Sequence, residues 1–243
     1  MKKNNIGTYT CDRVTDIPCD INNKVYKHYD NIIPNFLGEA VYIYSFKENK
    51  MLYAKGWENL LGYKDDEISM LKIITSTSKR HFNFSNELND KALKFIKNQT
   101  KDLTKYSFTI EVEKHHKNGD IIPLFSRVGI YKESNGQIEQ IIGVSQVIKS
   151  LKLSNIMQYA AYGPLIAKFE ETLNKELFNY YAISRKEKLA LELAAKGLTF
   201  KEIATIENVS LSAIEKRLLP LYKRFNVKSL PHLINFAHNN HII

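Results

Sequence analysis

The sequence lacks the segments that mark membrane and secreted proteins. No apolar run reaches the roughly 18 residues that a membrane-spanning helix needs. The first residues, MKKNNIGTYTCDR, carry positive charge but no apolar segment of the kind that a secretory signal contains. We therefore expect a cytoplasmic protein that does not enter a membrane.

Cysteine is scarce, with only Cys11 and Cys19 in 243 residues. A chain of this length can bury a core without disulfides, and the cytoplasm keeps thiols reduced. A metal site built from Cys11, Cys19 and His28 would have too few ligands at too loose a spacing. We expect two free thiols and no metal.

Glycine is also scarce, at ten residues, and no stretch resembles a phosphate-binding loop. The G-x-G-x-x-G, P-loop, G-x-S-x-G and H-E-x-x-H motifs are all missing. The scattered Asp, His and Ser residues give no reason to choose a catalytic set. We expect that the protein is not an enzyme.

Positive charge is what the sequence has in excess. Of the net charge of +9, residues 183–243 contribute +5, because they hold ten Lys and Arg against five Glu and no Asp. This concentration favours a nucleic-acid partner whose affinity falls as salt rises. Basic charge alone would also suit RNA or an anionic membrane surface.

The same C-terminal stretch predicts three short helices with tight joints. Gly197 would end the first helix. The candidate N-caps are Ser184, Thr199 and Ser210, with Glu187 and Glu202 at capping-box spacing from the first two. The third helix would bury a stripe at helical spacing, formed by Ile214, Leu218, Leu221 and Phe225.

The other side of the third helix is polar and cationic. It holds Ser212, Lys216 and Lys223, with Arg217 and Arg224 along its flanks. An apolar stripe backed by cationic side chains suits a helix that enters the DNA major groove. The alternative is an ordinary solvated face on a basic protein.

The stretch resembles the LuxR-type helix-turn-helix domain, also called the GerE or NarL-like output domain. The most specific match is Lys201-Glu202-Ile203-Ala204 after a Gly-terminated helix, followed by Val209-Ser210 and Ile214-Glu215. The resemblance implies an all-α four-helix domain over 183–243, whose third helix reads double-stranded DNA. It also implies a fourth helix from Leu230 that pairs two chains into a homodimer. The DNA-binding residues that it implies are Thr199, Lys201, Ser210, Ser212, Ala213, Glu215, Lys216, Arg217, Lys223, Arg224 and Lys228.

Two departures from the family pattern concern the third helix. Ala213 stands where the family usually has Thr, and Pro220 falls inside the helix. An interior proline removes one backbone donor and crowds the carbonyl of Lys216, at a cost of about 3 kcal/mol. We therefore expect a kink, or a helix that restarts at Pro220. These departures keep a second function open, a protein-interaction adaptor with a degenerate helix-turn-helix.

The N-terminal part predicts a sheet with helices. Residues 1–30 are polar and are predicted to form an arm, with a helix near Asn22–Tyr29. In residues 31–149 we expect two strands, short helices and a longer helix at Glu87–Asn98, then a meander of three strands with turns at Asn118-Gly119 and Asn135-Gly136. The whole chain is thus predicted to be α+β, with a five-stranded antiparallel sheet that carries helices on one face.

This element order resembles a PAS sensor domain. The matching segments are Ala40–Phe46, Trp57 with Leu60-Leu61-Gly62-Tyr63, Lys117-Asn118-Gly119-Asp120 and Gly143-Val144-Ser145. A GAF-like or an acyl-homoserine-lactone-binding domain is the alternative. The resemblance implies a ligand or a dimer contact between the sheet and the helices, and the candidate pocket residues are Tyr42, Tyr44, Trp57, Phe95, Phe108 and Phe125. These aromatic residues could instead simply fill the core.

No cofactor is expected in this domain. Light-sensing flavin chemistry would need a cysteine inside the domain, and both cysteines lie before it. Haem would need an axial histidine. His81 lies in a stretch predicted to be irregular, and His115-His116 lead into a turn, so these histidines are predicted to be surface groups.

Residues 150–182 are predicted to form a helical linker. Leu165, Phe169, Leu173 and Leu177 repeat at i+4 spacing after Gly163-Pro164. This stripe would either carry a dimer contact or pack against the chain's own sensor. The sequence thus predicts a sequence-specific transcriptional regulator in which a PAS-like sensor controls a LuxR-type output domain, with an unidentified small molecule as the candidate ligand of the sensor. An acyl-homoserine-lactone receptor is a further alternative.

Overall fold

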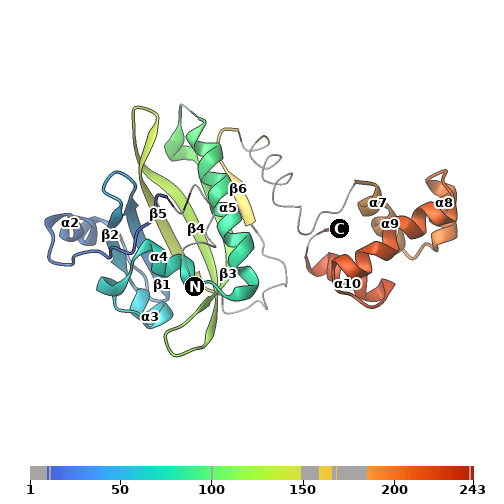
Figure 1. Cartoon of the computed structure of the whole chain (residues 1–243), viewed down its shortest axis with the longest axis horizontal. Helices are drawn as coiled ribbons and strands as arrows, with labels where there is room; N and C mark the ends of the chain where they lie inside the picture. Colours follow the sequence, from blue (N-terminus) through green and yellow to red (C-terminus); the bar gives the residue numbers. More distant parts are fainter. Residues whose placement is uncertain are drawn as a thin grey trace. The chain divides into compact units, whose positions relative to one another are not determined.

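The chain consists of two compact units. The computed structural model describes residues 10, 12–99, 101–148, 159–165, 168, 185–240 and 242–243. The first unit comprises residues 1–153 and 157–176, and the second comprises 154–156 and 177–243. Figure 1 shows the sheet of the first unit and the helices of the second.

The first unit is built on an antiparallel sheet with the strand order β2-β1-β5-β4-β3-β6 (Figure 1). Its strands are β1 (Glu39–Ser45), β2 (Lys50–Lys55), β3 (Ser107–His115), β4 (Ile121–Ser134), β5 (Gln137–Val147) and β6 (Tyr159–Tyr162). The five predicted strands are confirmed, and β3 to β5 form the predicted meander. The α+β prediction with a PAS-like sheet therefore holds.

The sixth strand, β6, falls within residues 150–182, which were predicted to be a helical linker. It pairs with β3 from Ser107 opposite Tyr162 to Ile110 opposite Tyr159. The free edge of β3 offers unpaired backbone groups, which a four-residue segment can satisfy without any periodic pattern of its own. Of the predicted linker stripe, Leu165 is 47% exposed, whereas Phe169, Leu173 and Leu177 lie outside the described residues.

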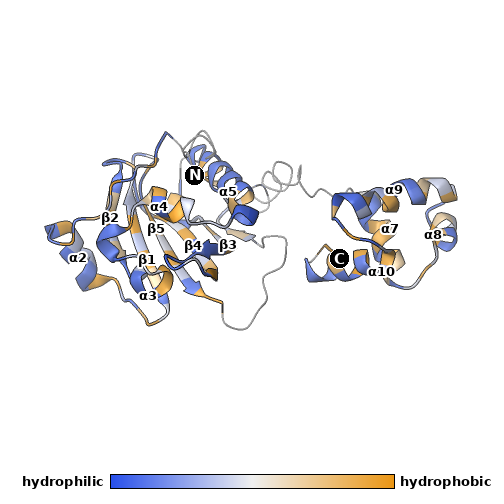
Figure 2. Ribbon diagram, turned by 60° about the horizontal axis from the view of Figure 1, so that its bottom comes forward, coloured by the Kyte–Doolittle hydropathy of each residue, from blue (hydrophilic) through white to orange (hydrophobic). Residues whose placement is uncertain are grey.

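Helices α3, α4 and α5 cover one face of the sheet, as predicted (Figure 2). The helical segments of this unit are α2 (Lys24–Ile32), α3 (Trp57–Leu61), η2 (Asp65–Glu67), α4 (Met70–Thr75), α5 (Lys79–Lys97) and η3 (Leu103–Lys105). Helix α5 starts well before the predicted Glu87, so His81 lies on a helix and not in an irregular stretch. It is also 1% exposed, so the prediction of a surface group is wrong. Buried polar residues, including His81, Ser85 and Asn86, interrupt the apolar spacing from which a helix is predicted. The first turns of α5 were therefore not predicted from the sequence.

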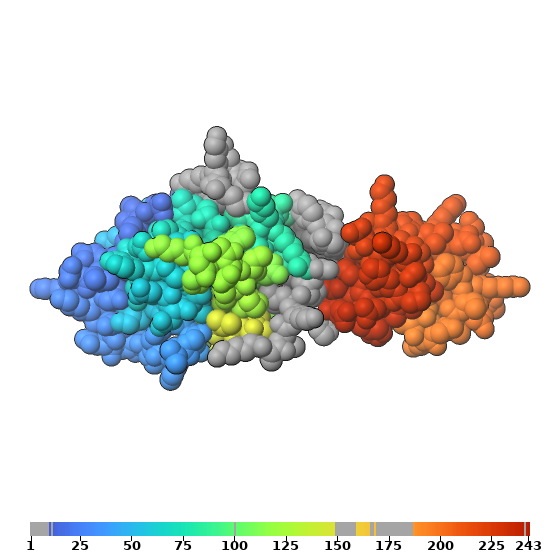
Figure 3. All heavy atoms as spheres, turned by 90° about the horizontal axis from the view of Figure 1, so that it is seen from below, coloured from blue at the N-terminus to red at the C-terminus, as the bar shows by residue number. Residues whose placement is uncertain are grey.

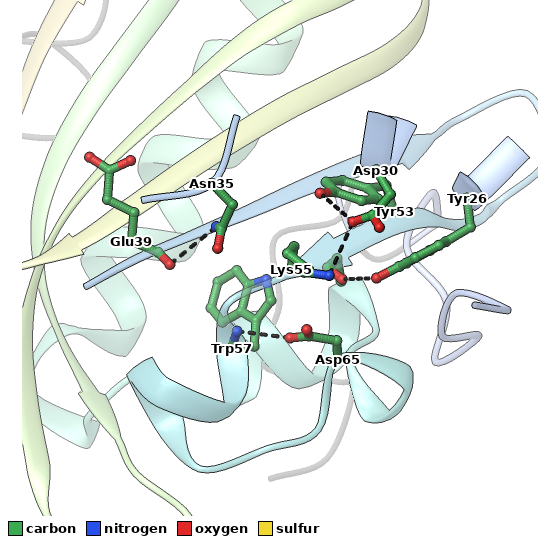
Figure 4. Close-up of polar contacts among 9 residues, drawn as sticks. Tyr26, Asp30, Asn35, Glu39, Tyr53, Lys55, Trp57 and Asp65 are labelled. Atoms are coloured by element: carbon green, nitrogen blue, oxygen red, sulfur yellow. Dashed lines mark hydrogen bonds and ion pairs between the residues drawn. The ribbon is translucent and has the colours of Figure 1, made fainter. Parts of the chain in front are cut away.

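Helix α2 packs against the opposite face, so the prediction that all helices share one face does not hold for it. The rings of Tyr26 and Tyr29 lie 5.1 Å and 6.1 Å from that of Tyr53. Tyr53 pairs with Ile43, and side chains alternate along a strand, so it points away from the face that Tyr42 occupies. The hydroxyl of Tyr26 donates to the carbonyl of Ala54 at 3.2 Å (Figure 4).

The described residues before position 31 therefore belong to the packed unit and do not form a separate arm. Val14 and Cys19 are buried, at 3% and 4% exposure. Asp30 accepts a hydrogen bond from the Tyr53 hydroxyl at 3.3 Å and pairs with Lys55 at 3.1 Å (Figure 4). These contacts join α2 to β2. They connect residues far apart in the sequence, which local patterns do not reveal.

The described residues of the second unit form an all-α domain of four helices, as predicted. They are α7 (Arg185–Ala195), α8 (Phe200–Ile206), α9 (Leu211–Arg224) and α10 (Leu230–Asn239). The helices enclose one core, in which Leu191, Ile203, Ile214, Leu218, Leu221 and Leu233 are fully buried. Polar and apolar segments alternate along each helix in Figure 2, as expected of amphipathic helices. None of the described helices is both long and apolar enough to cross a bilayer.

Pro220 does not interrupt α9, which continues as one helix from Leu211 to Arg224. The expected restart at Pro220 is therefore wrong. Leu218 and Leu221 on either side are fully buried, whereas Pro220 is exposed. The packing of these leucines stabilises the helix and offsets the loss of the backbone hydrogen bond that Pro220 removes. The proline ring lies on the solvent side of the helix and does not disturb this packing.

Candidate DNA-binding surface and sensor cavity

The helix-turn-helix is held together by two side-chain caps. Thr199 accepts a hydrogen bond from the Glu202 N–H at 3.3 Å, and Glu202 accepts one from the Thr199 N–H at 2.8 Å. These bonds from Thr199 lower the pKa of the Glu202 carboxyl. Ser210 caps α9 by accepting from the Ala213 N–H at 3.2 Å. The hydroxyls of Thr199 and Ser210, both predicted to bind DNA, therefore position α8 and α9.

The turn between α8 and α9 needs a left-handed residue. Asn208 supplies it with φ at 51°, a conformation that Asn tolerates better than most residues. Gly197, with φ at 91°, plays the same part between α7 and α8. The turn at Asn208 fixes the angle between α8 and α9, and the turn at Gly197 fixes the angle between α7 and α8.

The exposed side of α9 presents a row of side chains one helical turn apart. Ser212, Lys216, Leu219 and Lys223 are all exposed and lie opposite the buried leucines of the same helix. Lys216 and Lys223 form no ion pair within the described part of the chain. Long side chains project from this unit, coloured orange to red in Figure 3. The cationic face of α9 is therefore open to a phosphate backbone.

The two arginines of α9 are held by carboxylates of its own unit. Arg217 pairs with Glu207 at 3.2 Å, and both side chains are mostly buried, at 16% and 17% exposure. Arg224 pairs with Glu187 at 3.2 Å. The first pair fastens α9 to the end of α8, and the second fastens it to α7. Sequence patterns did not reveal these pairs, because the partners stand ten and 37 residues apart.

We expect Arg217→Ala to destabilise the second unit by about 1–3 kcal/mol, because Glu207 would be left nearly buried without a partner. Lys216→Ala on the adjacent exposed position should change stability by less than about 0.5 kcal/mol. Hydrogen–deuterium exchange of the α8 and α9 amides in the full chain would measure both. Equal exchange in the two variants would show that the ion pair does not stabilise the fold.

The first unit contains a partly open cavity of about 80 Å³ between the sheet and helices α4 and α5. Of the six predicted pocket residues, Tyr42 and Phe108 line it. Tyr44, Trp57 and Phe95 are buried elsewhere in the core, and Phe125 points to the opposite face of β4 from its neighbours Leu124 and Ser126. Tyr44, Trp57 and Phe95 therefore fill the core, as the alternative stated, whereas Phe125 is half-buried.

Tyr42 depends on a glycine across the sheet. Gly143 stands opposite Tyr42 in the register of β1 and β5. A Cβ atom on Gly143 would lie 2.1 Å from Cε1 of the Tyr42 ring, so only glycine leaves room for it. Burial raises the pKa of the Tyr42 phenol, which keeps its hydroxyl protonated.

Lys114 is a cavity residue that the sequence analysis missed. It follows Phe108, Ile110 and Val112 in the inward phase of β3, and it is 7% exposed. Its ammonium group donates to the Ile73 carbonyl at 2.5 Å and to the Thr77 hydroxyl at 2.7 Å. Burial lowers the pKa of Lys114 to about 7. The alternation of β3 already indicated that this lysine points inward.

The Lys114 pKa predicts that the first unit becomes more stable between pH 7 and pH 9. In this range an unfolded lysine, with a pKa of 10.5, keeps its proton, whereas folded Lys114 loses it. The folded state then binds fewer protons, so the free energy of unfolding rises with pH, by about 2 kcal/mol relative to Lys114→Met. Below pH 7 Lys114 is charged in the folded state as well, so the first unit then bears the full cost of burying this charge. Urea unfolding followed by the fluorescence of Trp57, the only tryptophan, would measure the difference, and a difference independent of pH would contradict it.

Comparison with known proteins identifies the second unit. The family model described as "Bacterial regulatory proteins, luxR family" (GerE) matches residues 182–237. The C-terminal unit carries a LuxR-family helix-turn-helix domain. A probable transcriptional regulator, ycf29 of Pyropia yezoensis, is 35% identical over 72 residues, which cover 30% of this chain and 32% of that protein. The chain thus spans about a third of the length of this curated relative.

Solved structures similar to the chain include the Vibrio cholerae VqmA dimer in the absence of target DNA, at 13% identity and a TM-score of 0.35. The similarity covers 90% of this chain and 89% of that one. They also include the PAS domain of a Colwellia psychrerythraea protein, at 18% identity and a TM-score of 0.37, over 53% of this chain and 98% of that one. VqmA is described as a LuxR-type receptor.

Within the LuxR-family domain, most of the predicted DNA-binding residues lie on α8, on α9 or at their N-caps. Lys201 is exposed on α8, Ala213 and Glu215 are half-buried on α9, and Lys228 lies beyond α9, where its N–H donates to His232 Nδ1 at 3.3 Å. The structure thus brings the predicted residues to one helix-turn-helix. On α9, the two arginines form ion pairs with glutamates of the same unit, whereas the two exposed lysines form none among the described residues.

Proposed function

We propose that this protein is a cytoplasmic, sequence-specific DNA-binding regulator of transcription without catalytic activity, in which the PAS-like unit controls the LuxR-family domain. The observation that carries the proposal is the exposed row of Ser212, Lys216 and Lys223, which backs onto a fully buried core. A rigid helix with free lysines on its outer side can enter the major groove and bind phosphates on either side of it.

We further propose that the protein acts as a homodimer. Two copies of α9 would then occupy two half-sites about one helical turn of DNA apart. Helix α10 is the segment that the family resemblance assigns to this contact. On its surface Pro231, His232 and Asn235 are exposed, and Ile234 is half-buried.

Selection of binding sites from a random duplex library, followed by a salt series, tests the proposal. We expect an enriched site with two half-sites, two chains per duplex, and an affinity that falls by at least roughly 100-fold between about 50 and 200 mM salt. The rival adaptor function, which Ala213 and Pro220 keep open, predicts no enriched site. An affinity that is insensitive to salt would also contradict the proposal.

The cavity is small for an acyl-homoserine lactone. A cavity of about 80 Å³ is far below the roughly 300–1,000 Å³ of typical ligand pockets. A lactone ring with an acyl chain is larger than this cavity. The described cavity therefore favours a smaller ligand for the PAS-like unit.

A further inference from the structure

The charges around the sensor cavity are of one sign. Among the described residues, the charged ones that line it are Lys114 and Arg127, and none is an Asp, Glu or His. Lys114 belongs to β3 and Arg127 to β4, two strands that pair with each other. Arg127 is exposed, with its guanidinium 5.3 Å from the centre of the Tyr162 ring, and it points to the opposite face of β4 from Ser126. Lys114 is therefore the cation whose charge lies at the cavity, and no acidic residue of the described lining balances it.

The ammonium group of Lys114 has only neutral partners. It has three N–H donors, and its hydrogen bonds to the Ile73 carbonyl and the Thr77 hydroxyl use two of them. A buried charge is costly unless an opposite charge pairs with it. Within the described part of the chain no carboxylate does so, whereas the cavity beside Lys114 has room for one that comes from outside.

The other polar groups of the cavity are rich in donors. The Tyr42 hydroxyl has no hydrogen-bond partner among the described residues, although the ring is buried. The hydroxyl of Thr10 is itself fully buried and has no hydrogen-bond partner in the described part of the chain. Ser126 and Ser145 share one hydrogen bond of 2.8 Å, which uses one of their two hydroxyl hydrogens and leaves the second available. Unsatisfied buried donors are rare in folded proteins and call for an acceptor.

The rest of the lining is apolar, and it limits what an acceptor can be attached to. It consists of aliphatic and aromatic side chains, with Ile73 and Leu93 from the helices facing Phe108, Ile110 and Ile141 from the sheet. A ligand that fits must therefore present an apolar body to these side chains and one charged acceptor to the donors. The cavity volume of about 80 Å³ limits it to a small molecule.

We propose that the sensor cavity binds a small organic acid, whose carboxylate pairs with the Lys114 ammonium group and whose apolar body packs between the sheet and helices α4 and α5. The Tyr42 hydroxyl donates a second hydrogen bond to the carboxylate. This proposal names the kind of ligand for the sensor role proposed above. It depends on that role only for the claim that ligand binding controls DNA binding. Because ligand binding and DNA binding are measured separately, the two proposals can fail independently.

Matched acids and amides test the charge requirement. Isovalerate, 2-furoate and isobutyrate, each with its primary amide, would be titrated into the full-length protein and followed by ligand-observed NMR and by the shift in melting temperature. We expect at least one acid to bind, and its amide to bind at least roughly tenfold more weakly, because the amide brings no charge to Lys114. Failure of all three acids at millimolar concentration, or equal binding of an acid and its amide, would overturn the proposal.

Three variants locate the site. Lys114→Met, which keeps the side-chain volume, should abolish acid binding, whereas Lys79→Met, at an exposed position on α5, should leave it unchanged. Tyr42→Phe keeps the ring that packs on Gly143 and should weaken acid binding several-fold, which provides a test even if Lys114→Met does not fold. Acid binding that survives both cavity substitutions would overturn the proposal.

The affinity for the selected DNA site, measured with and without the bound acid, separates the two levels of inference. A change in DNA affinity that depends on Lys114 supports both the ligand and the control of the output domain. Acid binding that leaves DNA affinity unchanged supports the ligand site, and it contradicts the proposed control by the PAS-like unit.

Discussion

Replacing Lys216 and Lys223 together by alanine should lower DNA affinity by roughly 100-fold at about 0.15 M salt and reduce the salt dependence of binding. Each lysine that contacts a phosphate contributes close to one unit to the slope of log affinity against log salt. In a dimer each substitution acts twice, so the slope should fall by about four. Both side chains are exposed and unpaired within the described residues, so the fold should remain intact. Fluorescence anisotropy with labelled DNA across a salt series would measure both quantities.

A control with the same loss of charge is available on and just after α7. Lys188→Ala with Lys196→Ala removes two exposed positive charges from the same domain but not from α9. We expect this variant to retain affinity within about threefold, since the exposed face of α9 is intact. If the control weakens binding as strongly as the α9 variant, overall charge and not the face of α9 holds the DNA. Arg217 is unsuitable for this test, because its replacement also removes the partner of Glu207.

Gly143→Ala should destabilise the first unit by about 3 kcal/mol, the upper part of the usual range for overpacking in a core. The added Cβ would lie 2.1 Å from Cε1 and 2.3 Å from Cζ of Tyr42, inside van der Waals contact with a ring that is 6% exposed. The ring would have to turn into the cavity or the strands would have to separate. Trp57 fluorescence reports unfolding of this unit, because the Trp57 ring lies 6.3 Å from that of Tyr42.

Gly129→Ala is the matched control in the neighbouring strand. Its nearest contact would be the Ser107 Cβ at 3.4 Å, so we expect a change below about 1 kcal/mol. In a Tyr42→Ala background, Gly143→Ala should likewise cost little, since the ring it strikes is gone. A cost that stays near 3 kcal/mol in that background would show that the backbone at Gly143, and not the Tyr42 ring, is responsible.

Elements with a strong local signal could be predicted from the sequence. The caps at Thr199 and Ser210 and the apolar stripe of α9 depend on residues within four positions of one another, and the structure confirms them. The strands of the meander were predicted for the same reason, because alternation along a strand and a turn at Asn135-Gly136 are local features. The sequence also indicated that Lys114 points inward, although it was overlooked among the aromatic candidates.

Features that depend on distant contacts were not predicted. The strand β6 exists because the edge of β3 is free, and α2 is held by tyrosines that pack on Tyr53, a residue on the same face of the sheet but far away in the sequence. Pro220 fits inside α9 because the leucines beside it are buried by other helices. In each case the deciding partner lies outside the window in which a periodic pattern can be recognised.

By itself the sequence determined that this protein joins a PAS-like sheet to a LuxR-family helix-turn-helix with a basic outer face, because those assignments follow from spacing and local chemistry. Only the tertiary structure decided which cations are free and which are used. It paired Arg217 with Glu207 and Arg224 with Glu187, left Lys216 and Lys223 in solvent, and buried Lys114 beside a cavity without a counter-charge. The physical reason is that the state of a charge depends on the groups that folding brings within a few ångströms of it, and most of these are remote in the chain.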